Sequence, residues 1–107
     1  MTRGWAASPA RPVSEADFQS QVLDLARITG WRHFHVHDSR RSPHGFPDLV
    51  LCRPPELVFA ELKSATGRLT AEQSAWLELL RACGQRVFCW RPADWAEITA
   101  TLARRRT

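Results

Sequence analysis

Residues 47–63, PDLVLCRPPELVFAELK, contain the clearest structural signal in the sequence. This segment contains two short apolar runs, residues 49–52 and 57–63, and the pair Pro54-Pro55 separates them. Short continuous apolar runs bounded by turn residues are typical of strands that are covered on both faces. The prolines favour a tight turn between the runs. The sequence therefore predicts two paired strands, each buried on both sides.

Upstream of these strands, the sequence predicts one helix and one further strand. The helix begins after Ser14, which can cap it, and ends near Gly30. Its apolar residues recur at helical spacing: Phe18, Val22, Leu25 and Ala26. Residues 31–37 alternate instead, as a half-buried strand does. We expect two apolar side chains on its buried face and three imidazoles on the other: Phe34 and Val36, then His33, His35 and His37.

Downstream, the sequence predicts a helix, a strand and a last helix. Residues 70–73 (TAEQ) match a capping box, and the helix that follows ends at Gly84. Its expected buried stripe consists of Trp76, Leu77, Leu80 and Cys83. Residues 87–90 predict a fourth strand that Pro92 closes. The last helix carries Trp95, Ile98 and Leu102, so the predicted order of elements is αβββαβα.

Composition places the chain among single-domain globular proteins. It has 107 residues, of which 44% are hydrophobic and 24% charged. Residues 1–12 lack a periodic apolar pattern, so we expect a flexible arm followed by one domain over 13–107. The sequence shows no membrane span and no signal peptide, which favours a soluble cytoplasmic protein. A net charge of +4 is compatible with a polyanionic partner but is not specific for one.

The cysteines and histidines carry no strong metal signal. Cys52, Cys83 and Cys89 are odd in number, widely spaced and set among apolar neighbours, so we interpret them as buried thiols. The three alternating histidines could bind zinc, but a partly exposed strand face carries polar residues anyway. Of these three, His37 is nearest to the loop that leads to Asp48. A surface histidine remains the favoured interpretation even there.

The candidate chemistry rests on Asp48, Glu61 and Lys63. Phosphodiester hydrolysis needs a cation that neutralises the phosphate and activates water, and Mg²⁺ binds one or two carboxylates with waters completing its shell. Residues two apart on a strand point the same way, so Glu61 and Lys63 project together while the Leu62 side chain turns away. The Leu62 carbonyl is then available as a further ligand. The Lys63 ammonium can stabilise negative charge in the transition state.

An ordinary structural explanation exists for each motif taken alone. A Glu-x-Lys pair on a strand usually forms a weak surface ion pair, and an aspartate beside a proline usually makes a turn. Glu61, however, lies inside the apolar run Val58-Phe59-Ala60-Glu61-Leu62, where an unpaired charge is costly. The context therefore favours a functional carboxylate.

Four short motifs follow one another along the chain: Gly45-Phe46-Pro47-Asp48-Leu49, Glu61-Leu62-Lys63-Ser64, Gly67 with Leu69-Thr70, and Gln73 with Trp76-Leu77. Together they resemble the virus-type replication-repair nuclease (VRR-NUC) domain of the PD-(D/E)xK superfamily. The resemblance runs from about Glu15 to residue 90 and implies an α/β fold with a restriction-endonuclease-like αβββαβ core. That core has a mixed four-stranded sheet flanked by helices, and here a C-terminal helix follows it.

The resemblance also implies roles for individual residues. Asp48 and Glu61 would be metal ligands for Mg²⁺ or Mn²⁺, and Lys63 would be the catalytic lysine. Glu15 matches an additional acidic residue and Gln73 a glutamine near the site. From the residues alone, Glu15 is explained by the helix dipole and Gln73 by a capping box with Thr70. Only the family pattern makes these two residues candidates for the site.

DNA contacts are expected from basic residues around the motifs: Arg40, Arg41, His44, Arg68 and, less directly, His37. A solvated loop is the alternative. The sequence contains no recognition-helix motif or zinc finger, which favours branched DNA over a base sequence as target. Compact members of the family resemble phage nucleases and junction resolvases that act as homodimers, so a homodimer is expected.

The sequence thus predicts a metal-dependent DNA endonuclease selective for branched DNA, such as a Holliday junction, flap or fork. The abundance of Ala and Arg suggests a bacterial or phage origin. One alternative is a catalytically inactive DNA-binding or assembly module with the same fold. Another is a protein-interaction domain with surface ion pairs, which predicts neither metal binding nor salt-dependent affinity for DNA.

Overall fold

A computed structural model describes residues 13–36 and 44–104. In chain order its elements are α2 (Glu15–Ile28), β1 (Arg32–His35), β2 (Leu49–Arg53), β3 (Glu56–Leu62), α3 (Ala71–Ala82), β4 (Arg86–Trp90), the 3-10 turn η1 (Pro92–Asp94) and α4 (Trp95–Leu102). The predicted order αβββαβα is confirmed, and η1 is an addition that begins at the proline expected to close the fourth strand. The expected N-terminal arm lies outside the described residues.

The four strands form one mixed sheet in the order β1-β2-β3-β4. The pairs β1–β2 and β2–β3 are antiparallel, and β3–β4 is parallel. A parallel pair needs a crossover connection, which α3 provides between β3 and β4. This arrangement confirms the predicted α/β class with a mixed four-stranded sheet.

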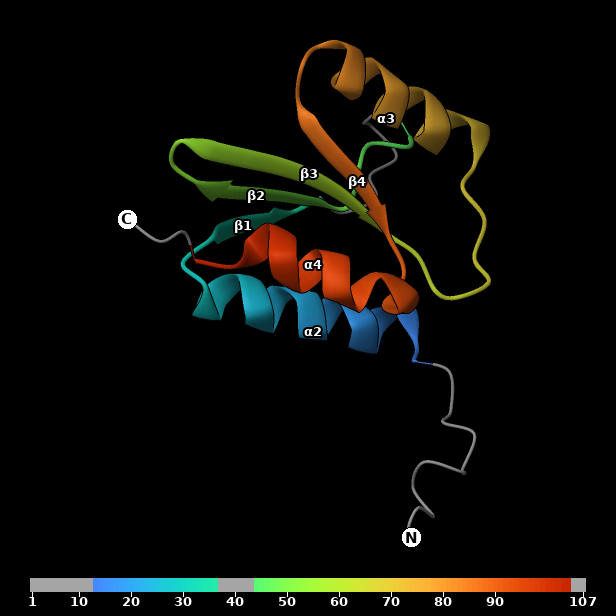
Figure 1. The fold of residues 1–107 in the computed structure, drawn as a ribbon. Coiled ribbons are helices and arrows are strands. Elements are labelled where there is room, and N and C mark those ends of the chain that lie inside the picture. The colour runs from blue at the N-terminus through green and yellow to red at the C-terminus, as the bar shows by residue number, and fades with distance from the viewer. Residues whose placement is uncertain (1–12, 37–43, 105–107) are drawn as a thin grey trace, which may run out of the picture.

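The main core lies between the sheet and the helices α2 and α4, which run side by side across one face (Figure 1). Ser14 caps α2 because its Oγ accepts a hydrogen bond from the N–H of Asp17 at 3.0 Å. Every second side chain of β2 and β3 points into this core, as strand geometry requires. The residues fully buried there include Phe18, Val22, Ala26, Leu49, Leu51, Val58, Ala60, Leu62, Trp90, Ile98 and Leu102.

Helix α3 lies on the other side of the sheet (Figure 1). Its Trp76 packs edge-on against Phe46, and Phe46 packs edge-on against Phe59 of β3, with ring centroids 5.1 and 6.0 Å apart. Leu77 of α3 is buried, as is Val87, which pairs with Phe59 in the sheet. Because Glu61 lies two residues beyond Phe59 on the same strand, its side chain projects to the face that α3 covers. Among the described residues, no helix is both long and apolar enough to cross a membrane.

The expected orientation of the strand β1 was wrong. The register pairs Phe34 with Val50 and His33 with Leu51, so Phe34 shares the α3 face of the sheet while His33 and His35 share the face of the main core. Phe34 is nevertheless 65% exposed, because β1 is an edge strand and α3 lies over the opposite edge. His33 is exposed and His35 half-buried.

Three further expectations about burial also need correction. Cys83 is exposed at the end of α3, and of the expected buried stripe only Leu77 is fully buried, since Trp76 and Leu80 are half-buried. Cys52 is exposed and Cys89 half-buried, so the cysteines are not the buried thiols that the sequence suggested. The hairpin is covered on both faces only beneath α3, because Cys52 and Leu57 lie beyond the reach of that single short helix.

Candidate active site

Asp48 and Glu61 meet because the β2–β3 hairpin has a two-residue turn. Arg53 pairs with Glu56 next to the turn, and Leu49 pairs with Ala60 at the other end of the ladder. One step further, Asp48 therefore lies opposite Glu61, with both side chains on the same face. Asp48 is held in place, since its Oδ2 accepts a hydrogen bond from the N–H of Leu62 at 2.9 Å.

Glu61 is a buried carboxyl in a site that disfavours its charged form. It is 2% exposed. Burial first, and repulsion from Asp48 second, raise the pKa of Glu61 from 4.5 to about 8, while the nearby Lys63 charge opposes this rise. Its Oε1 atom is buried without a hydrogen-bond partner among the described residues. A carboxyl with these properties is poised to accept a cation.

Lys63 shares the face of Glu61, as its position two residues further along the strand predicts. The Lys63 Nζ lies 3.7 Å from Glu61 Oε2, and both side chains are largely shielded from solvent. The distance is that of an ion pair without a close hydrogen bond. The ammonium can therefore turn toward another anion without first breaking a short contact.

Gln73 reaches the same carboxylate from α3. Its Nε2 donates a hydrogen bond to Glu61 Oε2 at 3.1 Å, while its Oε1 accepts one from the N–H of Thr70 at 2.9 Å. The Thr70 Oγ1 in turn accepts from the N–H of Gln73, which completes a capping box. Gln73 can therefore cap α3 and contact the site at the same time, because its amide oxygen accepts from Thr70 while its amide nitrogen donates to Glu61.

Glu15 is more remote from the site than the other candidates. It is the first residue of α2 and is exposed. Its charge contributes least among the groups that shift the pKa of Glu61. The structure thus brings Asp48, Glu61, Lys63 and Gln73 together and leaves Glu15 at the edge of the group.

The residues expected to contact DNA are only partly described. Arg68, in the segment between β3 and α3, and His44, in the turn that leads to Asp48, are both exposed. Arg40, Arg41 and His37 lie outside the described residues. The interpretation of these five residues as DNA contacts stays a prediction.

Three residues near the site carry roles that the sequence did not reveal. Gly45 has a φ of +96°, and a Cβ there would lie 2.6 Å from the carbonyl carbon of Glu72, so only glycine fits. Arg91 donates a hydrogen bond through Nη1 to the carbonyl of Ser64 at 2.7 Å. Cys89 pairs with Glu61 across β3 and β4, and burial raises the pKa of its thiol. Gly45 belongs to the motif that contains Asp48, but its contact with the backbone of Glu72 on α3 is visible only in the tertiary structure.

The donor set of the site fits a hard divalent cation. Within residues 13–36 and 44–104, no three His, Cys, Asp or Glu side chains form a metal-binding cluster. Mg²⁺ needs only one or two carboxylates, with waters and carbonyls supplying its other ligands. The Asp48–Glu61 pair meets this requirement, and the buried, unpartnered Oε1 of Glu61 is an oxygen that a cation would satisfy.

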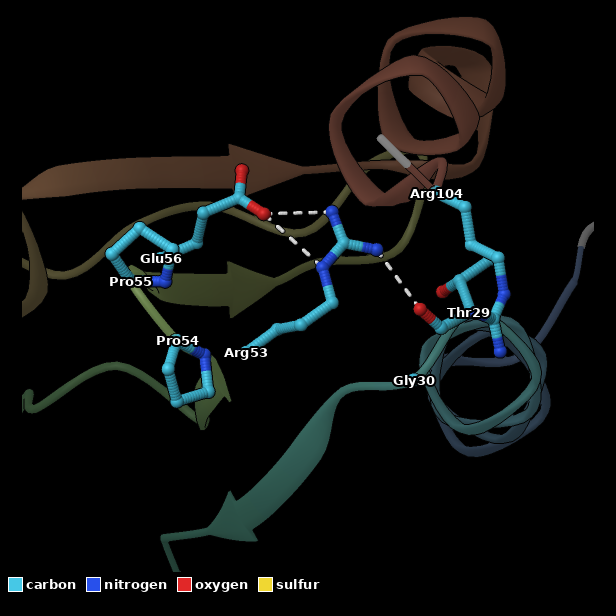
Figure 2. Close-up of a pocket in the computed structure, with 7 residues that line it drawn as sticks. All are labelled: Thr29, Gly30, Arg53, Pro54, Pro55, Glu56 and Arg104. Carbon is cyan, nitrogen blue, oxygen red and sulfur yellow. Dashed lines mark hydrogen bonds and ion pairs between the residues drawn. The ribbon is translucent and has the colours of Figure 1, made fainter. Parts of the chain in front are cut away.

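A hollow of about 310 Å³ lies at the turn end of the β2–β3 hairpin, away from Asp48 and Glu61. Figure 2 shows Arg53 extending across it from Glu56 toward Thr29. All five N–H groups of Arg53 are used, since the guanidinium donates to Glu56 Oε1 twice and to three backbone carbonyls, of Thr29, Leu102 and Ala103. The guanidinium also lies 4.4 Å from the Trp31 ring centroid. Arg53 therefore ties the hairpin to the C-terminal ends of α2 and α4.

Comparisons with known proteins point to one family. A family model described as the VRR-NUC domain matches residues 7–93. A solved structure described as a VRR_NUC domain protein is similar at a TM-score of 0.65 and 16% identity, over 89% of this chain and 94% of that one. Hjc from Archaeoglobus fulgidus, described as a Holliday junction resolvase, is similar at a TM-score of 0.52 and 22% identity, over 70% of this chain and 66% of that one. No match was found among curated proteins.

Proposed function

This chain belongs to the VRR-NUC domain family, and we propose that it is a metal-dependent endonuclease that hydrolyses phosphodiester bonds in DNA. The observation that carries the proposal is the meeting of Asp48 with the buried Glu61, beside Lys63. Two acidic groups that lie against each other, one of them buried, raise the free energy of the metal-free protein at neutral pH. A divalent cation bound between them relieves that cost. A merely structural pair would instead be stabilised by a hydrogen-bonded basic partner.

Mg²⁺ or Mn²⁺ is the proposed cofactor, held by Asp48, Glu61 and the carbonyl of Leu62, with Glu15 as a further candidate. When bound, the cation supplies neutralisation of the phosphate charge and a lowered pKa for a bound water. The chain's own part is to present both carboxylates on rigid strands. Leu62 contributes through its N–H, which fixes Asp48, and through a side chain buried in the core.

Lys63 and Gln73 have complementary proposed roles around Glu61. The Lys63 ammonium stabilises the negative charge that develops on the phosphate oxygens during hydrolysis. The Gln73 amide holds one oxygen of Glu61 by donating to it, so the carboxylate keeps one orientation. These two donors approach the same Oε2 atom, which leaves Oε1 available.

Branched DNA is the proposed substrate, contacted by Arg40, Arg41, His44, Arg68 and His37. Support comes from the fold, which Hjc shares, because that protein is described as a Holliday junction resolvase. We further propose a homodimer, since Phe34 and Leu57 expose apolar surface on one face of the sheet. Two copies would offer two sites for the two strands of a junction.

Cleavage of a panel of DNA substrates tests the proposal. The purified chain and the variant Lys63→Ala are incubated with flap, fork, four-way junction and linear duplex DNA in Mg²⁺, Mn²⁺ or EDTA. We expect cutting of branched DNA that requires the metal and that falls about 100-fold or more in the variant. Cleavage in EDTA, or full activity of Lys63→Ala, contradicts the mechanism. Binding of DNA without any cutting would instead favour an inactive DNA-binding module.

A further inference from the structure

The capping box of α3 and the buried carboxylate share a single side chain, that of Gln73. Its carbonyl oxygen Oε1 accepts from the N–H of Thr70 at 2.9 Å, and its Nε2 donates to Glu61 Oε2 at 3.1 Å. An amide group has one accepting end and one donating end. Because the cap uses the accepting end, only the donating end faces Glu61.

The cap alone does not require a glutamine at this position. Glutamate satisfies the same reciprocal contacts of a capping box, and its charge favours the first turn of a helix. At residue 73, however, the second carboxylate oxygen of a glutamate would face Glu61, which Asp48 already repels. The site therefore discriminates between two residues that the helix accepts equally.

The first turn of α3 is also packed against the segment that carries Asp48. A Cβ on Gly45 would lie 2.6 Å from the carbonyl carbon of Glu72 and 2.8 Å from the nitrogen of Gln73. This close backbone approach holds the start of α3 and the segment before Asp48 at a fixed separation. The cap of α3 is therefore in direct contact with the segment that leads to Asp48.

We infer that Thr70 is a positioning residue. Its hydroxyl accepts from the N–H of Gln73 and so holds the first turn of α3 in the geometry in which the Thr70 N–H reaches Gln73 Oε1. The Gln73 NH₂ group is thereby directed to Glu61 Oε2, which leaves Glu61 Oε1 free for a ligand. The inference rests on the proposed function for its consequence in catalysis. The fixed orientation of the Gln73 amide is a property of the metal-free protein, so it can be tested without measuring cleavage.

Four variants separate positioning from simple stability. Gln73→Glu keeps the capping box but replaces the NH₂ group that faces Glu61 by a carboxylate oxygen. Thr70→Ala removes the hydroxyl of the capping box while the Gln73 side chain remains. Thr70→Ser restores the hydroxyl. The matched control is Ala75→Gly, an exposed position inside α3 where glycine weakens the helix by about as much as loss of a cap does.

Thermal unfolding and single-turnover cleavage of a four-way junction with Mn²⁺ are then compared. Gln73→Glu keeps the capping box, so it should remain folded at the assay temperature, yet it should cleave about tenfold or more slowly, because a hydrogen bond to Glu61 is replaced by repulsion. Thr70→Ala and Ala75→Gly should lose similar stability, but only Thr70→Ala should lose cleavage several-fold. Thr70→Ser should restore it. A Gln73→Glu variant as active as the parent, or equal cleavage by Thr70→Ala and Ala75→Gly, overturns the inference.

A second readout keeps failure of this inference distinct from failure of the proposed function. In the metal-free protein, NMR of the Gln73 side-chain amide reports whether the NH₂ group is held, through the separation of its two proton resonances and their slow exchange with solvent. We expect Thr70→Ala to collapse that separation and Ala75→Gly to preserve it. If the parent cleaves no DNA but this pattern holds, only the proposed function fails. Identical Gln73 resonances in the parent and Thr70→Ala contradict the positioning role whatever the cleavage result.

Discussion

The replacement Glu61→Gln should stabilise the metal-free protein at neutral and alkaline pH, because the fold opposes ionisation of this carboxyl. Burial and then Asp48 raise its pKa from 4.5 to about 8. Below pH 4.5 the Glu61 carboxyl is neutral in both the folded and the unfolded chain, so its ionisation takes nothing from the free energy of unfolding. As the pH rises, the unfolded chain releases the proton first, and stability is lost progressively until the pH passes the folded-state pKa.

The size of the effect follows from the shift. At 1.36 kcal/mol per pKa unit, the raised pKa of Glu61 lowers the free energy of unfolding by about 3 kcal/mol at pH 7 and by about 5 kcal/mol above pH 8. The glutamine of the variant would carry no such cost, since its amide stays neutral. The parent's free energy of unfolding should therefore fall between about pH 5 and pH 8 relative to that of the variant.

Urea unfolding in EDTA at acid, neutral and alkaline pH measures this difference. Glu97→Gln, which removes an exposed glutamate from α4, is the matched control and should follow the parent's pH dependence. Adding Mg²⁺ should restore part of the parent's stability at high pH and have little effect on Glu61→Gln. If the parent and Glu61→Gln show parallel pH profiles, the electrostatic account of the site is refuted.

Three further predictions follow from the rest of the fold. Arg53→Ala should lower the free energy of unfolding by about 2–4 kcal/mol, because three carbonyls and Glu56 each lose a hydrogen bond from the guanidinium; a loss near zero in urea unfolding would contradict the role of Arg53. Phe34→Thr should change the stability of the monomer by less than about 0.5 kcal/mol, since the ring is 65% exposed, and a large loss in dilute solution would show that this face is covered. A thiol reagent should modify the exposed Cys52 and Cys83 of the folded protein before Cys89, because burial raises the pKa of the Cys89 thiol. Faster reaction of Cys89 would contradict its partial burial in the sheet.

The sequence was sufficient to predict the order of the elements and to expect that three candidate site residues, Asp48, Glu61 and Lys63, lie together. Periodic apolar residues such as Phe18, Val22 and Ala26 identify α2 because a helix must bury one stripe. The Asp48–Glu61 contact follows from local chemistry, since a two-residue turn between β2 and β3 determines which residues face each other. Lys63 follows from the two-residue period of a strand.

The parts that could not be predicted depend on how elements pack. The expected orientation of β1 was wrong because alternation does not reveal which face a distant helix will cover, and α3 leaves Phe34 exposed. The contact between Gln73 and Glu61 requires α3 to cross over that face, and the parallel pairing that brings Cys89 beside Glu61 requires the same crossover. The sequence shows Gly45 as part of a motif, but it does not show why a glycine is required there, because the Glu72 backbone that excludes a side chain belongs to α3.

Mg²⁺-dependent cleavage by the variant Asp48→Asn tests whether the carboxylate pair Asp48–Glu61 holds a catalytic metal. The asparagine can keep the hydrogen bond that Asp48 accepts from the N–H of Leu62, so the fold is preserved while the charge beside Glu61 is removed. Single-turnover cleavage of a four-way junction is measured at saturating protein, with DNA binding measured in parallel. We predict cleavage by the parent only with the cation, and a rate lower by about 100-fold or more in Asp48→Asn at equal DNA binding. Cleavage by the parent in EDTA, or full-rate cleavage by Asp48→Asn, would contradict a metal-dependent nuclease built on Asp48 and Glu61.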